Sequence, residues 1–225
     1  MDLIASLIDK IIHLNPESVN AMALTFGPWL YVLLFGIVFA ETGLVVTPFL
    51  PGDSLLFAVG AVAAVPDSPI NLTLTCFLLI VAAVLGDAVN YTIGYHVGPR
   101  IFSREESWLL NKEHLLRAQR FYEQYGGKTI ILARFIPIIR TFAPFVAGIG
   151  KMNYARFFAF NVVGGIAWVV MFLVGGWWFA EREYVQKNFK VVILAIIVVS
   201  VLPGAIEFVR ARMSRSRTED VSIGN

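Results

Sequence analysis

Apolar residues of this chain form long runs, and one run is interrupted at residues 39–53 by prolines, glycines and two acids (FAETGLVVTPFLPGD). Residues 29–40 before the interruption and 54–65 after it are apolar. Each of these arms is much shorter than the roughly 20 residues that a helix needs to cross a bilayer. Two short arms around a proline-rich centre are typical of a re-entrant hairpin, which enters and leaves the membrane by the same face. The pattern predicts such a hairpin over residues 29–65.

A second interruption of the same kind occurs at residues 133–150 (ARFIPIIRTFAPFVAGIG), which again holds two prolines and two charged residues. A charge at membrane depth costs roughly 2.5–3.5 kcal/mol on insertion scales. A broken backbone is tolerated there only where protein or a wet cavity surrounds it. Residues 129–150 are therefore predicted to form a second re-entrant hairpin, and the two hairpins are expected to surround a polar site.

Longer apolar runs predict complete membrane spans, because each approaches or exceeds the length that a bilayer requires. The predicted spans are residues 71–98, 152–179 and 191–209. Residues 1–14 are predicted to form an amphipathic helix, which lies either at the membrane interface or on the surface of the bundle. Residues 100–128 form a hydrophilic loop, and residues 210–225 a basic tail. Lys and Arg concentrate on the cytoplasmic side of membrane proteins. The loop and the tail are therefore expected in the cytoplasm, and the two hairpins then approach each other from opposite leaflets.

Composition supports an all-α integral membrane protein with a single membrane domain over residues 1–225. Hydrophobic residues make up 57% of the chain, charged residues 15%, and the mean hydropathy is +0.71, whereas soluble domains carry about 25% charged residues. Cys76 is the only cysteine, so no internal disulfide is expected, and the three histidines lack metal-ligand spacing. No catalytic motif of the G-x-S-x-G or H-E-x-x-H type occurs. We therefore expect no enzyme activity, metal or cofactor.

A short internal repeat links the two interruptions. The segment PFLPG at 48–52 corresponds to PFVAG at 144–148. Inverted repeats with discontinuous segments that meet near the middle of the membrane are an architecture of transporters. The repeat therefore favours a transporter-like fold.

Arg134 and Arg140 are the two arginines of the second hairpin. A planar guanidinium fork suits phosphate, so one interpretation is a membrane-embedded site for an anionic headgroup. Backbone groups beside prolines and glycines would support such a site, and the candidate positions are Pro48, Pro51, Gly52, Pro137 and Pro144. The alternative is that the two arginines only form ion pairs with Glu41, Asp53 or Asp87.

Glu41 and Asp53 are candidates for carrying protons, because a carboxyl group buried beside an arginine can bind and release a proton in the physiological pH range. The alternative for Asp53 is a helix N-cap before the apolar run that follows it. Asp87 and Asn90 lie on the polar face of the predicted span 71–98. They are expected to bond across helices or to support the site.

Three long motifs resemble the bacterial DedA family: ETGLVVTPFLPGDSLLF at 41–57, GDAVNYTIG at 86–94 and GGKTIILARFIPIIRTFAPFVAGIGKM at 126–152. The family is similar in its core to the VTT-domain lipid scramblases of eukaryotes. The resemblance implies a multi-pass protein of the bacterial inner membrane that returns undecaprenyl phosphate to the cytoplasmic leaflet, with the proton-motive force involved. It also implies that the membrane-embedded acids of the family match Glu41 and Asp53, and that its essential arginines match Arg134 and Arg140.

The sequence thus predicts a helical, inverted-repeat transporter of a polyprenyl phosphate, with its C-terminus in the cytoplasm. Membrane lipids, the polyprenyl phosphate and protons are the expected partners; nucleic acid is not, and a homo-oligomer is left open. Two other functions fit the same residues. One is a proton-coupled exporter of small cations or drugs, in which the acids bind the substrate. The other is an intramembrane scaffold for envelope homeostasis.

Overall fold

The computed structural model describes residues 23–44, 52–101, 126–182, 185 and 191. Within these ranges every regular element is a helix and no strand occurs, which confirms the predicted all-α class. The predicted helix 1–14 and the tail 210–225 lie outside the described residues, as do nearly all of the loop 100–128 and the span 191–209.

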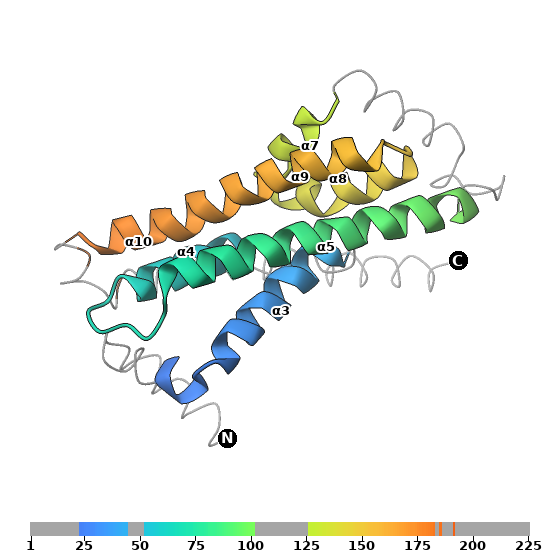
Figure 1. Cartoon of the computed structure of the whole chain (residues 1–225). Helices are drawn as coiled ribbons and strands as arrows, with labels where there is room; N and C mark the ends of the chain where they lie inside the picture. Colours follow the sequence, from blue (N-terminus) through green and yellow to red (C-terminus); the bar gives the residue numbers. More distant parts are fainter. Residues whose placement is uncertain (1–22, 45–51, 102–125, 183–184, 186–190, 192–225) are drawn as a thin grey trace, which may run out of the picture.

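Two long helical stretches form the frame of the molecule, as Figure 1 shows. Helix α5 covers Leu72–Ile101; α9, Tyr154–Val169, continues through a π-helical turn η1, Val170–Val174, into α10, Gly175–Ala180. Residues 72–97 and 154–180 are long and apolar enough to cross a membrane. At 1.5 Å per residue they reach about 40 Å, more than the roughly 30 Å of a hydrocarbon core.

Four shorter helices fill the two predicted hairpin regions. The first region holds α3, Trp29–Gly43, and α4, Gly52–Ala63. The second holds α7, Lys128–Ala133, and α8, Pro137–Ile149. None of the four has the length of a complete span. Whether each pair enters and leaves the membrane by one face, and whether the pairs are inverted repeats, stays a prediction.

The break between α7 and α8 has a local cause. Ile136 is extended, with φ −113° and ψ 109°, and Pro137 follows at the first position of α8. The ring of a proline disfavours helical geometry in the preceding residue, but its own fixed φ suits the start of a helix. The sequence Ile-Pro therefore ends one helix region and starts the next.

The short helices pack at opposite ends of the frame. Helix α4 lies against η1 and α10, whereas α8 lies against the C-terminal half of α5. Glycines allow backbone contact at both places: a Cβ at Gly60 would lie 1.9 Å from the carbonyl oxygen of Leu173, and one at Gly94 would lie 2.1 Å from that of Phe145. The N-terminal ends of α4 and α8 consequently meet between the long helices.

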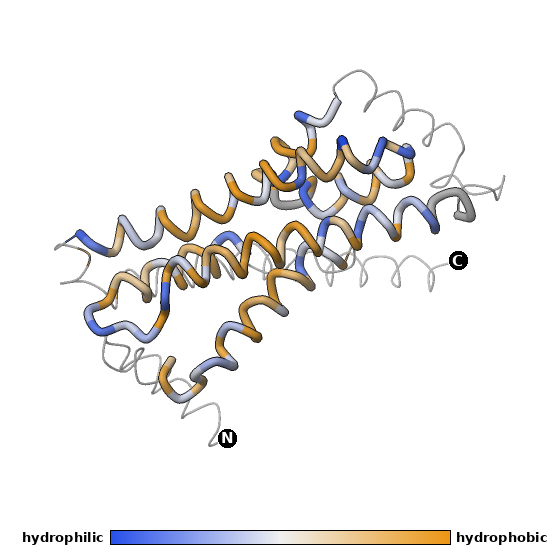
Figure 2. The backbone as a smooth tube through the Cα atoms, viewed as in Figure 1, coloured by the Kyte–Doolittle hydropathy of each residue, from blue (hydrophilic) through white to orange (hydrophobic). Residues whose placement is uncertain are grey.

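Hydrophobic residues predominate along the described helices, as the colouring in Figure 2 shows, and they occur on the outside as well as in the core. Large hydrophobic residues with high exposure occur on several helices; examples are Trp29, Phe77, Val163 and Trp178. An apolar exterior of this extent is a liability in water but the normal surface of a protein in lipid. Most of the buried polar and charged residues lie where the short helices meet.

We expect Gly94→Ala to destabilise the fold by about 1–3 kcal/mol, because the new methyl group would overlap the backbone of α8. Gly36→Ala in α3 is the matched control, since a Cβ there meets no heavy atom within 4 Å and alanine favours the helix. Thermal unfolding of the purified proteins in detergent measures both changes. Equal unfolding temperatures for Gly94→Ala and Gly36→Ala would show that α5 and α8 do not touch as described.

Candidate functional site

Arg140 joins four helices through its guanidinium group. From the first turn of α8, Nη2 donates to Oε1 of Glu41 on α3, and Nη1 donates to Oδ1 of Asp53 on α4. The same Asp53 oxygen accepts a hydrogen bond from Nε1 of Trp168 on α9 at 2.7 Å. The guanidinium carbon also lies 5.4 Å from the ring centroid of Trp168, in cation–π range. We call Glu41, Asp53, Arg140 and Trp168 the Arg140 cluster.

The two acids of this cluster differ in access. Glu41 is fully buried, whereas the side chain of Asp53 is 31% exposed. Oε2 of Glu41 has no hydrogen-bond partner among the described residues. The cluster is therefore closed on the side of Glu41 and open on the side of Asp53.

Gly52 fixes the position of Glu41. Its backbone N–H donates to Oε1 of Glu41 at 3.1 Å. A Cβ at Gly52 would lie only 1.8 Å from Oε2 of the same carboxylate. The carboxylate thus occupies the space beside the first residue of α4, where the positive end of the helix dipole favours an anion.

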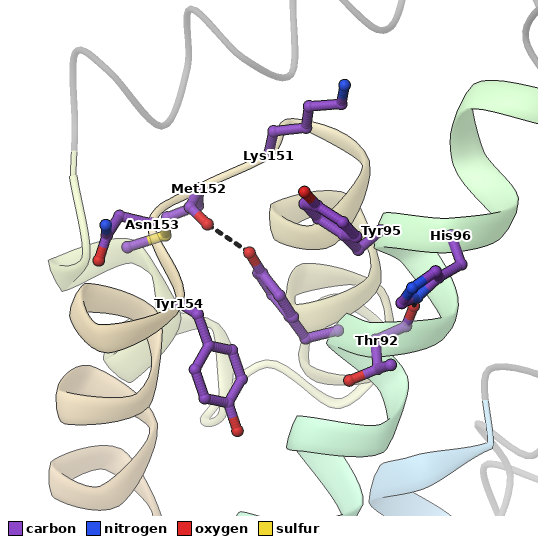
Figure 3. A pocket seen from close by; sticks show the side chains of 8 residues that line it. Thr92, Tyr95, His96, Lys151, Met152, Asn153 and Tyr154 are labelled. Atoms are coloured by element: carbon purple, nitrogen blue, oxygen red, sulfur yellow. Dashed lines mark hydrogen bonds between the residues drawn. The ribbon is translucent and has the colours of Figure 1, made fainter.

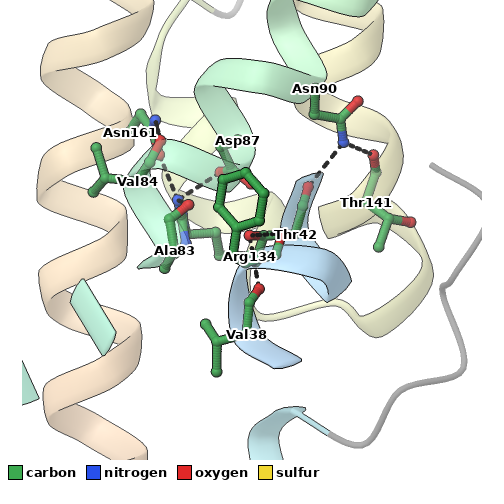
Figure 4. A network of polar contacts seen from close by, with 10 residues as sticks. Val38, Thr42, Ala83, Val84, Asp87, Asn90, Arg134, Thr141 and Asn161 are labelled. Atoms are coloured by element: carbon green, nitrogen blue, oxygen red, sulfur yellow. Dashed lines mark hydrogen bonds and ion pairs between the residues drawn. The ribbon is translucent and has the colours of Figure 1, made fainter. Parts of the chain in front are cut away.

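Arg134 forms a second cluster with residues of α5 and α9, which Figure 4 shows. Its Nη2 contacts Oδ2 of Asp87 at 2.5 Å, donates to Oδ1 of Asn161 and reaches the carbonyl oxygen of Ala83 at 3.4 Å. Asn161 in turn donates to the carbonyl oxygen of Val84 at 2.9 Å. Both charged side chains are almost completely buried. We call Asp87, Arg134 and Asn161 the Arg134 cluster.

Asn90 ties the short helices to α5. Its Nδ2 donates to the carbonyl oxygens of Thr42 at 3.1 Å and Thr141 at 2.8 Å (Figure 4). It therefore holds the end of α3 and the start of α8 together, next to the residues that carry Glu41 and Arg140. Its Oδ1 has no partner among the described residues.

A cavity of about 10 Å³ separates the two clusters. Its lining residues are Thr42, Asp87, Arg134, Arg140 and Trp168. This volume is about the least that can hold one water molecule. The Nε atoms of Arg134 and Arg140 also lack partners among the described residues. The two charge clusters are thus immediate neighbours within one polar interior.

The structure brings together most of the residues that the sequence selected. Arg140 lies with Glu41 and Asp53, and Arg134 lies with Asp87, so each arginine has the ion-pair partners of the alternative interpretation. Whether any of these residues also bind a substrate or carry protons stays a prediction.

The predicted prolines have different outcomes. Pro48 and Pro51 lie outside the described residues. Pro137 starts α8, and Pro144 lies inside it. A proline has no N–H, so Pro144 provides no helical hydrogen bond for the carbonyl oxygen of Arg140, four residues earlier.

Sequence reasoning missed Trp168, Asn161 and Thr42 as members of the site. Asn161 and Trp168 are seven residues apart and share one buried face of α9. An amide and an indole at this spacing in an otherwise apolar span were the available signal, because polar groups within a span are expected to face the protein interior.

Fold and site together define a helical membrane protein with a charged interior enclosed by discontinuous helices. A family model for the VTT domain matches residues 50–178. The chain is 50% identical over 217 residues to protein DedA of Escherichia coli K12, which covers 96% of this chain and 99% of that protein. These matches show that the chain belongs to the DedA family of VTT-domain proteins.

Two further relatives agree with this assignment. An uncharacterized membrane protein of Mycobacterium tuberculosis H37Rv is 42% identical over 181 residues, 80% of this chain and 78% of that protein. The inner membrane protein YqjA of Escherichia coli K12 is 37% identical over 160 residues, 70% of this chain and 71% of that protein. No solved structure gives a significant match.

We expect Arg134→Gln and Asp87→Asn each to destabilise the protein by about 3–5 kcal/mol, because each leaves a buried charge without its partner. The double variant should lose much less than the sum of the two single losses, since no uncompensated charge remains. Chemical or thermal unfolding of the four proteins gives the coupling. Additive losses would show that Arg134 and Asp87 do not depend on each other.

Proposed function

We propose that the protein moves undecaprenyl phosphate, or a closely related polyprenyl phosphate, between the leaflets of the bacterial inner membrane, with protons coupled to the movement. The observation that carries the proposal is that the buried guanidinium of Arg140 has one partly exposed ion-pair partner, Asp53. A phosphate oxygen can take the place of the Asp53 carboxylate on Nη1, whereas the bond to Glu41 persists. Membership of the DedA family supports an inner-membrane location, because the relative YqjA is an inner membrane protein.

Lipid phosphates suit a site of this kind for a physical reason. The polyprenyl tail is already at home in hydrocarbon, whereas the phosphate is expensive there. A carrier therefore needs to shelter only the headgroup and can leave the tail in the lipid. Helices α4 and α8 both begin at the Arg140 cluster, so their positive dipole ends add to the guanidinium charge.

Charge balance supports proton coupling. Three carboxylates, Glu41, Asp53 and Asp87, stand beside two arginines in the two clusters, which leaves one net negative charge in their ionised forms. An incoming phosphate would increase this negative charge in a poorly solvated interior. Uptake of a proton by Glu41 or Asp53 offsets the added charge, so binding of phosphate and binding of a proton favour each other.

The same excess of acid supports a second candidate function. A small cation would neutralise the net negative charge directly, with Asp53 as the accessible ligand. In that case the protein is a proton-coupled exporter of small cations or drugs, and Arg140 positions the acids. An intramembrane scaffold would transport neither class of substrate.

Purified protein in liposomes with labelled undecaprenyl phosphate distinguishes these functions. Arg140→Gln should slow lipid transfer by about ten- to a hundredfold, the loss expected for one charge-assisted contact. Arg182→Gln is the matched control, because Arg182 is exposed at the end of α10 and packs over Trp178. Arg140→Lys should transfer lipid little faster than Arg140→Gln, because an ammonium group does not reproduce the guanidinium fork.

Three results would reject the lipid proposal in this assay. They are transfer that does not depend on Arg140, a cation flux without lipid transfer, and no transport at all from folded protein. Because Arg140→Gln leaves two acids without their counter-charge, Arg140→Gln/Glu41→Gln serves as the folded reference. In the protein with Arg140 unchanged, the single variant Glu41→Gln should abolish the dependence of lipid transfer on the pH gradient.

We also propose that the loop 100–128 and the C-terminus lie in the cytoplasm, because both are rich in Lys and Arg. In a Cys76→Ala background, Asp67→Cys between α4 and α5 should react with an impermeant maleimide added to intact spheroplasts. Lys112→Cys should react only after lysis. Labelling of Lys112→Cys in intact spheroplasts would reverse the proposed orientation.

A further inference from the structure

A second cavity lies at the end of α5, away from the two charge clusters. It has a volume of about 390 Å³ and is open to the outside. Figure 3 shows side chains from α5 on one side and from the turn between α8 and α9 on the other. Its lining includes Tyr91, Tyr95, His96, Lys151, Asn153 and Tyr154. We call this cavity the interfacial pocket.

Lys151 sits at a backbone position that does not suit lysine. Its φ is +52°, in the left-handed region that glycine and asparagine adopt at much lower cost. Two hydrogen bonds hold the turn. The N–H of Lys151 donates to the carbonyl oxygen of Gly148 at 3.0 Å, and the hydroxyl of Tyr91 donates to the carbonyl oxygen of Met152. The backbone of the strained lysine is thus fixed at the rim of the pocket, and its side chain is exposed with the ammonium directed outward (Figure 3).

The electrostatic character of the interfacial pocket is positive. Its lining includes no acid, and Lys151 has no ion-pair partner among the described residues. His96 donates Nδ1–H to the carbonyl oxygen of Thr92 at 2.9 Å, which fixes its ring at the wall. Asn153 caps α9 with its Oδ1, so its amide NH₂ stays available for a ligand.

Tyrosines give the pocket the character of a membrane interface. Tyr95 and Tyr154 are 43% and 50% exposed, and both rings lie against the buried ring of Tyr91. Tyr95 and His96 also belong to the last turn of the stretch 72–97 that is able to cross the membrane. Tyrosine is enriched at this depth because its ring prefers the apolar side and its hydroxyl the headgroup side.

We propose that the interfacial pocket binds a phosphate group, with the ammonium of Lys151 as its counter-charge, and that the headgroup of an anionic lipid supplies this phosphate. Lysine at a left-handed backbone position costs conformational free energy that glycine or asparagine would avoid. Its presence there indicates that the positive charge itself has a role. The volume suits a headgroup, and the tyrosines suit the start of its acyl chains. The proposal does not depend on transport or on the Arg140 cluster.

Lys151→Asn tests the proposal, because asparagine accepts the left-handed backbone and removes only the charge. Lys128→Asn is the matched control: Lys128 is an exposed lysine at the start of α7 and does not line the pocket. Binding of phosphatidylglycerol to the purified full chain in detergent is measured by native mass spectrometry. Lys151→Asn should weaken binding at least about fivefold, and Lys128→Asn less than about twofold.

A thermal unfolding measurement separates this role from a structural one. Lys151→Asn should unfold at the same temperature as the parent protein or higher, because the backbone strain is relieved. A lower unfolding temperature together with unchanged lipid binding would make Lys151 a structural residue and overturn the proposal.

Two further arms identify the source of the phosphate and its place. One outcome is that inorganic phosphate requires Lys151 for binding while the lipid binds equally well without it. That result would keep the phosphate site but assign it to free phosphate. Lipid binding that is lost in Arg140→Gln and kept in Lys151→Asn would place the headgroup at the Arg140 cluster and overturn the interfacial site. A failure of lipid transfer in liposomes leaves this binding result unaffected.

Discussion

A guanidinium group buried where four helices meet is the constraint on which the rest of this structure depends. Removing an ion from water costs several kcal/mol even after relaxation, and removing one partner of a buried pair leaves that cost uncompensated. Arg140 therefore requires Glu41 and Asp53 beside it, and these acids come from the two helices of the other hairpin region. Helix α8 can begin at this point because the helix breaks at Ile136, directly before Pro137.

In a membrane, internal contacts of this kind must hold the whole helix bundle together. In lipid, the exterior offers no hydrophobic driving force for helix association, so close packing and internal polar contacts must hold the bundle together. The glycine contacts of α4 with η1 and of α5 with α8 supply the first. The two arginine clusters and Asn90 supply the second. The apolar exterior and the charged interior are thus two parts of one arrangement.

Local features of this fold could be predicted from sequence, whereas the partners of the charged residues could not. The break before Pro137 follows from the residue itself and its neighbour, and the long apolar runs follow from composition. By contrast, Arg134 contacts an acid 47 positions away, and Arg140 contacts acids 87 and 99 positions away. Several acids were equivalent in charge and depth, so only the three-dimensional packing decides between them. Trp168 was missed because an indole in an apolar span is also an ordinary core residue.

The two arginines, alike in sequence, are placed in different electrostatic situations, and this difference indicates which of them is able to exchange partners. Arg134 faces one acid and one amide, both buried, so Asp87 matches its charge away from the outside. Arg140 faces two acids, and one of them, Asp53, extends to an accessible edge where Trp168 also holds it. An anion that displaces Asp53 leaves that carboxylate its indole hydrogen bond and its partial exposure, although the carboxylate loses its counter-charge. Arg134 is therefore suited to hold the bundle closed, whereas Arg140 is the arginine that the proposed lipid phosphate would contact.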